Sequence, residues 1–207
     1  MGFLRVQFWV LFFFLLYIND IQYAVDPNIL RLFADDTGLF LHNKNLGALI
    51  TLFKNCFPHR KKWFVANKLT LNETKTFFSI FHARNKFVPP DLQDIRIDNM
   101  VVKRTQSAKY IGLIIDELLN WKDHVNTLIK SLLKYFGIFN NIKNFISEKI
   151  ARQLYYTFIY SRIKYGIEVY GACSKTLLSK LQILQNKLLK LVLRRNPLNI
   201  LTTYIAT

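Results

Sequence analysis

The sequence predicts an α+β fold in which short β-hairpins come first and long helices follow. Apolar residues alternate with other residues across positions 30–41, around two adjacent aspartates, which is the pattern of two strands joined by a tight turn. A second alternation, across positions 95–102, surrounds Asp98 and Asn99. From Asn120 onward apolar residues recur three and four positions apart, as in amphipathic helices. A chain of 207 residues can bury one full core or two small ones.

The formal net charge of +16 is concentrated in the C-terminal part of the chain. Residues 1–53 hold three basic and four acidic side chains, whereas residues 121–207 hold fourteen basic and three acidic ones. A basic region beside a carboxylate site suits a polyanion, with nucleic acid favoured over an anionic membrane surface. A merely solvated basic surface is the alternative. The hydrophobic content of 51% excludes a chain that is disordered by composition.

The cysteines and histidines form no recognisable metal or disulfide pattern. Cys56 and Cys173 stand alone without a Cys-x-x-Cys spacing, and the four histidines are scattered along the chain. The sequence therefore indicates neither a zinc site nor a disulfide framework. This usage favours a reducing compartment, and we expect an intracellular protein of the nucleus or cytoplasm.

Residues 1–24 allow two interpretations. A basic residue precedes an apolar run over positions 8–18, and the small residue Ala24 lies beyond it, which is the outline of a secretory signal peptide. The protein would then be secreted or membrane-anchored, although the run is too short for a comfortable transmembrane span. The other interpretation is a buried helix that ends at residues 19–20.

The hairpin predicted over residues 30–41 carries the candidate metal site. Asp35 and Asp36 lie where the chain reverses, and aspartate tolerates the backbone angles of a tight turn. Adjacent carboxylates are suitable ligands for a hard divalent cation such as Mg²⁺. Carboxylates that hold two such ions can drive in-line nucleotidyl transfer. Considered alone, such a pair is usually a solvated turn, and that interpretation is favoured until its neighbours are considered.

Spacing predicts the elements between the two hairpins. Residues 43–45 read as a loop that starts an amphipathic helix, which we expect to cross one face of a sheet. Pro58 should kink or end this helix, and a second helical piece then carries residues 63–65. A strand is predicted over residues 77–81. Residues 108–116 contain a further strand pattern with Gly112 inside it, where glycine permits close approach of another backbone.

The C-terminal part reads as long helices. Ser147 and Ser174 are candidate helix caps, and Asn196 with Pro197 ends the last helix. One face of that helix is apolar and consists of Leu177, Leu181, Leu184, Leu188 and Leu191. A basic stripe accompanies it and consists of Lys180, Lys187, Lys190 and Arg194. Such a stripe is either a solvated face or a surface that lies along a phosphate backbone.

Several runs, in order, resemble the reverse transcriptases of non-LTR (LINE-like) retrotransposons. Residues 33–37, Phe-Ala-Asp-Asp-Thr, resemble that family's Phe/Tyr-Ala-Asp-Asp-Thr signature. Residues 15–21 resemble its Leu-Leu-Tyr-Ile-Asn-Asp-Ile run, which favours a palm helix over a signal peptide. Residues 63–76 resemble its Trp…Asn-Lys-Leu-x-Leu-Asn-x-x-Lys-Thr run, and residues 108–116 its Lys-Tyr-Leu-Gly-Ile-x-Ile-Asp run. Residues 165–171 resemble its Tyr-Gly-x-x-Val-Trp-Gly run, with Tyr170 in the place of the Trp. Taken together, the resemblance covers roughly residues 11–196.

The resemblance implies a role for each matching residue. With the missing palm carboxylate supplied, Asp35 would bind Mg²⁺ and Asp36 would support it electrostatically, while Lys75 would neutralise charge on the departing pyrophosphate. Residues 110–112, which are Tyr110, Ile111 and Gly112, would support the primer end. The partners would be an RNA template, a DNA primer and a dNTP substrate, and the basic stripe would contact nucleic acid.

The resemblance also implies an architecture and a deficit. We expect a partial palm over residues 1–118, a helical thumb over 119–200 and a tail over 201–207. The family uses three catalytic carboxylates, and nothing in this sequence matches the first of them. Leu4, Arg5 and Val6 stand where the family has Pro, Gln and Gly in a loop that positions template and nucleotide. We therefore expect a fragment that lacks the fingers and is inactive alone, with a non-catalytic nucleic-acid-binding remnant as the alternative.

Overall fold

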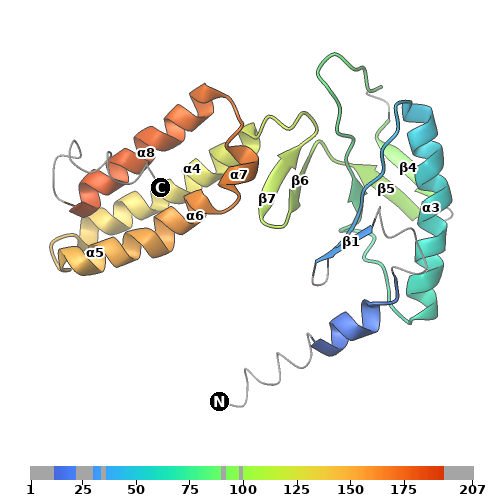
Figure 1. The fold of residues 1–207 in the computed structure, drawn as a ribbon, viewed down its shortest axis with the longest axis horizontal. Coiled ribbons are helices and arrows are strands. Elements are labelled where there is room, and N and C mark those ends of the chain that lie inside the picture. Colours follow the sequence, from blue (N-terminus) through green and yellow to red (C-terminus); the bar gives the residue numbers. More distant parts are fainter. Residues whose placement is uncertain (1–11, 22–29, 34–35, 90–91, 98–99, 194–207) are drawn as a thin grey trace. The chain divides into compact units, whose positions relative to one another are not determined.

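The computed structural model describes residues 12–21, 30–33, 36–89, 92–97 and 100–193. The chain divides into two compact units (Figure 1). The first unit comprises residues 1–80 and 84–105, and the second comprises residues 81–83 and 106–207. The described residues are helical and β-stranded in both units, so the predicted α+β class is confirmed.

A short helix and a β-hairpin begin the described part of the first unit. Residues 12–18 are helical, as predicted, but the expected burial of this helix is wrong. Its large apolar side chains are mostly exposed, and Ile18 is the buried one among residues 12–18. The Tyr17 hydroxyl donates a hydrogen bond to the carbonyl oxygen of Asn67. Strands β1 (Leu30–Phe33) and β2 (Asp36–Leu39) pair antiparallel. The alternation that we read across residues 30–41 therefore does form a hairpin.

One long helix and a small sheet complete the first unit. Helix α3 (Leu46–Ala66) begins where the Asn45 side chain accepts a hydrogen bond from the amide of Ala48, at 3.2 Å. The sheet has the order β3-β5-β4, with β3 (Phe77–Phe78) parallel to β5 (Met100–Arg104) and β4 (Asp94–Ile97) antiparallel to it. The second predicted hairpin is thus confirmed as β4–β5.

The core of the first unit explains its helix-on-sheet packing. Every second residue of the β4–β5 hairpin is buried, and these residues are Ile95, Ile97, Met100 and Val102. Phe57 of α3 is buried in the same cluster, with Phe53 and Phe78 packed at its edge. The apolar residues that recur every second position on the strands therefore pack against those that recur every 3.6 positions on the helix, in one apolar layer.

Two predictions for the first unit differ from the structure. The expectation that Pro58 divides the helix is wrong, because α3 runs without a break from residue 46 to residue 66 with Pro58 inside it. Phe57 directly precedes the proline and Phe53 lies one turn earlier, and their packing against the sheet offsets the missing amide hydrogen bond. The strand predicted over residues 77–81 is shorter, because only Phe77 and Phe78 pair with β5.

The second unit joins one hairpin to a group of helices. Strands β6 (Ser107–Tyr110) and β7 (Leu113–Asp116) pair antiparallel. The helical segments are α4 (Lys122–Ile142), α5 (Glu148–Tyr155), the π-helical turn η1 (Tyr156–Tyr160), α6 (Ser161–Lys164), α7 (Ile167–Tyr170) and α8 (Lys175–Leu193). Ser147 caps α5 as predicted, since its hydroxyl accepts from the amide of Ile150. Ser174 contributes its carbonyl oxygen to the start of α8.

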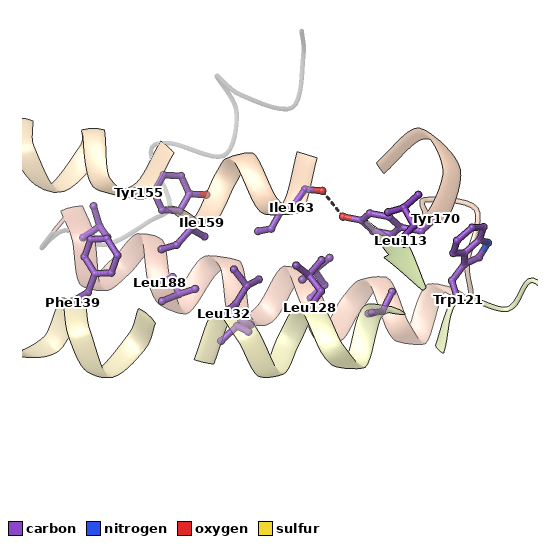
Figure 2. Close-up of a cluster of buried hydrophobic side chains, with 14 of the residues drawn as sticks. Leu113, Trp121, Leu128, Leu132, Phe139, Tyr155, Ile159, Ile163, Tyr170 and Leu188 are labelled. Atoms are coloured by element: carbon purple, nitrogen blue, oxygen red, sulfur yellow. Dashed lines mark hydrogen bonds between the residues drawn. The ribbon is translucent and has the colours of Figure 1, made fainter. Parts of the chain in front are cut away.

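The helices of the second unit share one core, drawn in Figure 2. Leu128 and Leu132 of α4 face Ile159 of η1 and Leu188 of α8 (Figure 2). Leu113 of β7 is buried in the same cluster. The hairpin β6–β7 thus belongs to the helical core by its packing. The palm and thumb boundary at residue 118 remains a prediction.

Within the described residues, no helix combines the length and apolar character needed to cross a bilayer.

Candidate functional site

The β1–β2 hairpin presents one of the two predicted metal-binding carboxylates. Phe33 pairs with Asp36, so the two strands are joined by a two-residue connection. Asp36 is exposed at the first position of β2. Asp35 lies in the connection and outside the described residues. The tight reversal that the sequence predicted is therefore present, with Asp36 on the strand rather than in the turn.

The donor chemistry at this hairpin fits a hard cation. The exposed carboxylate of Asp36 supplies oxygen ligands, which Mg²⁺ prefers, and a neighbouring carboxylate in the sequence would add more. Nowhere in the described part of the chain, this hairpin included, do three His, Cys, Asp or Glu side chains gather where they could hold a metal ion. The hairpin therefore suits Mg²⁺ in the chemical type of its ligands, which are the side chains of two aspartates.

Lys75 lies in a turn that Asn72 organises. The Asn72 side-chain oxygen accepts from the Thr74 hydroxyl at 2.7 Å and from the Lys75 amide at 3.2 Å. The Asn72 carbonyl oxygen accepts from the Thr76 hydroxyl at 2.8 Å. The turn leaves the Lys75 side chain exposed. The sequence reasoning did not assign this role to Asn72, although asparagine followed by threonine is typical of such turns.

The predicted primer-end segment is the turn of the β6–β7 hairpin. Tyr110 pairs with Leu113, and the two residues between them have positive φ angles, 45° at Ile111 and 76° at Gly112. Two successive positive φ values define the turn type whose twist suits a hairpin. Gly112 therefore lies in the turn, and the expectation that it lies inside a strand is wrong. Its close neighbour is a side chain, Tyr165, instead of another backbone.

Asp116 fixes the connection from this hairpin to α4. Its carboxylate is buried and accepts from the amides of Leu118 and Asn120, each at 3.1 Å, and of Trp121 at 2.8 Å. Trp121 is itself buried and precedes the first residue of α4. Asp116 thus acts structurally, and the sequence reasoning treated it only as part of a matching run.

His124 and Tyr170 are buried beside the hairpin. The His124 Nδ1 atom accepts from the amide of Ile114 at 3.3 Å, while its buried Nε2 atom has no hydrogen-bond partner among the described residues. Burial lowers the pKa of His124 below its usual value of 6.5. Burial raises the pKa of Tyr170 to about 12, and its hydroxyl donates to the carbonyl oxygen of Ile163. Both groups are therefore neutral at pH 7.

The basic stripe is partly visible on α8. Lys180, Lys187 and Lys190 are exposed, while Leu181, Leu184 and Leu188 of the same helix are buried. Arg194 lies outside the described residues. The helix therefore has the two-sided character that the sequence predicted.

The candidate residues fall into two groups. Asp36 and Lys75 belong to the first unit, whereas the turn at residues 110–112 and the α8 lysines belong to the second. What the fold does bring together, and the sequence reasoning missed, is the turn and Tyr165, whose positions are 54 residues apart.

Comparisons with known proteins identify relatives among mobile-element polymerases. The chain is 21% identical over 165 residues to the RNA-directed DNA polymerase from mobile element jockey of Drosophila melanogaster, covering 78% of this chain. It is 24% identical over 143 residues to the probable polymerase from transposon X-element, covering 66% of this chain. It is 24% identical over 175 residues to the probable polymerase from transposon BS, covering 82%. Both of these are from the same fly.

The matched part is a small share of each relative. It spans 18% of the jockey polymerase, 15% of the X-element polymerase and 19% of the BS polymerase. No protein-family model matches the chain, and no solved structure matches it. Through these matches, the chain is related in sequence to the RNA-directed DNA polymerases, or reverse transcriptases, of non-LTR retrotransposons.

Proposed function

We propose that this chain forms the C-terminal part of the palm and the thumb of an RNA-directed DNA polymerase of a non-LTR retrotransposon. The observation that carries the proposal is the hairpin β1–β2, whose two strands are joined through Ala34 and Asp35 and whose second strand begins at Asp36. The similarity to mobile-element polymerases over two thirds to four fifths of the chain supports it. The substrates would be an RNA template, a DNA primer and a dNTP.

In this proposal Asp35 and Asp36 would hold Mg²⁺ once the missing palm carboxylate is supplied. Bound Mg²⁺ supplies charge neutralisation on the attacking and leaving oxygens of an in-line displacement. The two aspartates are adjacent in the sequence, and Asp36 is exposed at the start of a paired strand. Lys75, exposed on the turn organised by Asn72, would place a positive charge near the leaving pyrophosphate.

The helical unit would hold the nucleic acid. The turn at Tyr110, Ile111 and Gly112 would support the primer end, and the exposed α8 lysines would contact phosphates. A second candidate is a non-catalytic nucleic-acid-binding protein. The observation that favours it is the excess of basic over acidic side chains in residues 121–207, fourteen against three, which is independent of the carboxylates.

Salt-dependent binding of a DNA-primed RNA tests the nucleic-acid part of the proposal. We expect binding to weaken steeply as salt rises, measured by fluorescence anisotropy of a labelled duplex. Replacing Lys180, Lys187 and Lys190 by alanine should reduce the magnitude of the log–log salt slope by about 2 to 3. The matched control replaces three exposed lysines of the first unit, Lys44, Lys54 and Lys62, and should leave the slope unchanged. Absence of salt-sensitive binding would overturn both candidates.

Iron-mediated cleavage separates the polymerase from the remnant. Fe²⁺ occupies Mg²⁺ sites and, with ascorbate and peroxide, cuts nucleic acid next to the bound ion. With the missing carboxylate supplied by adding the upstream palm segment of a related polymerase, we expect cuts at the primer 3′ end that disappear in Asp35→Asn/Asp36→Asn and persist in the control Asp94→Asn. Binding without localised cuts would favour the non-catalytic candidate.

The 207 residues alone should incorporate no nucleotide. The polymerase family that the chain resembles uses three carboxylates, and two matching ones are found in this sequence. The measurement is primer extension on an RNA template with a labelled dNTP. Clear incorporation that vanishes in Asp35→Ala would show that this expectation is wrong.

A further inference from the structure

The turn of the β6–β7 hairpin is held from outside by one side chain. The Tyr165 hydroxyl donates to the carbonyl oxygen of Ile111 at 2.8 Å. The Tyr165 ring also covers Gly112, since a Cβ added there would lie 3.1 Å from ring atom Cε1. Tyr165 follows the last residue of α6, so the contact fastens the turn to the helices.

The next residue along the chain makes the complementary contact. Gly166 has a φ of +70°, and a Cβ there would lie 2.7 Å from Cδ2 of Leu113. Leu113 is the first residue of β7 and is buried in the helical core, near Tyr170 in Figure 2. Two successive residues therefore contact the hairpin. Tyr165 does so through a hydrogen bond, and Gly166 allows close packing because it has no side chain.

The base of the hairpin is fixed by other residues. At the base, Asp116 accepts hydrogen bonds from three amides of the following loop. At the opposite end of the hairpin, Tyr165 bonds the turn residue Ile111, and the amide of Ile114 on β7 donates to His124 of α4. Tyr165 therefore holds the turn itself, while His124 and Asp116 hold the strand that follows it.

The backbone conformation of Ile111 is strained, so the turn needs this support. A β-branched residue with a φ of +45° is strained, because its side chain crowds the backbone in that conformation. Such conformations persist when the surrounding structure holds them. The hydrogen bond from Tyr165 is received by the carbonyl oxygen of this same residue.

We propose that Tyr165 is a positioning residue that holds the turn Tyr110–Gly112 in its strained conformation on the helical unit. Resting on the proposed function, this means that the segment supporting the primer end moves together with the thumb helices. Tyr165 acts through Ile111 and does not itself touch the reacting atoms.

Hydrogen exchange of the full 207-residue chain tests the positioning directly. Tyr165→Phe keeps the ring over Gly112 and removes only the hydroxyl. We expect exchange at the amides of residues 110–113 to rise roughly two- to tenfold, the range that corresponds to one net hydrogen bond, while peptides of α4 and α8 are unchanged. The control is Tyr160→Phe, an exposed tyrosine of the same unit. An unchanged turn would overturn the proposal.

A double-mutant cycle distinguishes positioning from general stabilisation. Ile111→Gly relieves the strain, because glycine adopts positive φ freely. In an Ile111→Gly background, Tyr165→Phe should raise exchange much less than it does in the wild-type chain. Equal effects in both backgrounds would show that Tyr165 does not act on the conformation of Ile111, and would overturn the proposal.

Fluorescence of 2-aminopurine at the primer 3′ end carries the test to nucleic acid. With a DNA-primed RNA bound, Tyr165→Phe should change the emission while duplex affinity stays within about twofold, since the phosphate contacts that dominate affinity are retained. If the wild-type chain binds no duplex, the proposed function fails. The double-mutant cycle measured by hydrogen exchange then still decides whether Tyr165 positions the turn. If the duplex binds and the emission is unchanged, the coupling of turn to primer end is wrong.

Discussion

Burial of His124 lowers the pKa of its imidazole below the usual 6.5, so the folded protein favours the neutral ring. The unfolded chain therefore binds a proton at a higher pH than the folded chain does. This contribution to stability is complete above pH 6.5 and is lost as the pH falls through the depressed pKa. Tyr170, whose ring centroid lies 4.9 Å away, stays neutral in that range and adds no charge.

We predict that acid below pH 6.5 destabilises the protein through His124. The unfolding free energy from urea titrations should fall between pH 7 and pH 5, and His124→Gln should flatten that dependence. His59→Gln, a change at an exposed position of α3, is the control. An identical pH profile in His124→Gln would assign the effect to other groups.

Asp116 is the second residue whose role depends on burial. Its carboxylate accepts three amide hydrogen bonds, so Asp116→Ala leaves three donors without an acceptor. We expect a loss of about 2–4 kcal/mol in unfolding free energy. Asp116→Asn keeps one side-chain oxygen and should lose less. The control is Asp123→Ala at an exposed position of α4, and an equal effect of the two alanine variants would contradict this role.

At the scale of elements, Pro58 shows how packing overrides a local rule. Proline lacks an amide hydrogen and crowds the carbonyl four residues earlier, yet α3 passes through it because the residues before it are packed on the sheet. We predict that Pro58→Ala stabilises the protein by about 1–3 kcal/mol, measured by urea unfolding. The control Thr51→Ala, at an exposed position of α3, should change stability by less than about 0.7 kcal/mol. A destabilised Pro58→Ala would show that the proline ring is needed for packing.

At the scale of the whole molecule, the two units have cores of different size. Among the described residues, nine apolar side chains are buried in the first unit, five of them in one cluster, and fifteen are buried in one cluster of the second unit. Because apolar burial is the main stabilising term, we expect the first unit to open first. Native-state hydrogen exchange in increasing urea should expose peptides of β4 and β5 before those of α4 and α8. The reverse order would contradict the prediction.

The local sequence pattern was sufficient to predict an element wherever the contacts that determine it are between residues close in sequence. The alternation across residues 30–41 and 95–102, the cap at Ser147 and the apolar face of α8 were all predicted and are all present. A strand or an amphipathic helix carries its periodicity in its own residues, so sequence alone reveals it. The carboxylate pair was found in the same way, because both members are adjacent in the chain.

Only the tertiary structure decided the features that depend on distant partners. The continuity of α3 depends on a sheet that begins after residue 76, and the grouping of β6–β7 with the helices depends on Leu113 entering their core. Tyr165 and Ile111 are 54 positions apart, and no periodicity links them. The sequence by itself determined which segments are strands and helices and where the acidic pair falls. Folding determined which of these segments hold one another, because that depends on shape and burial between residues far apart in the chain.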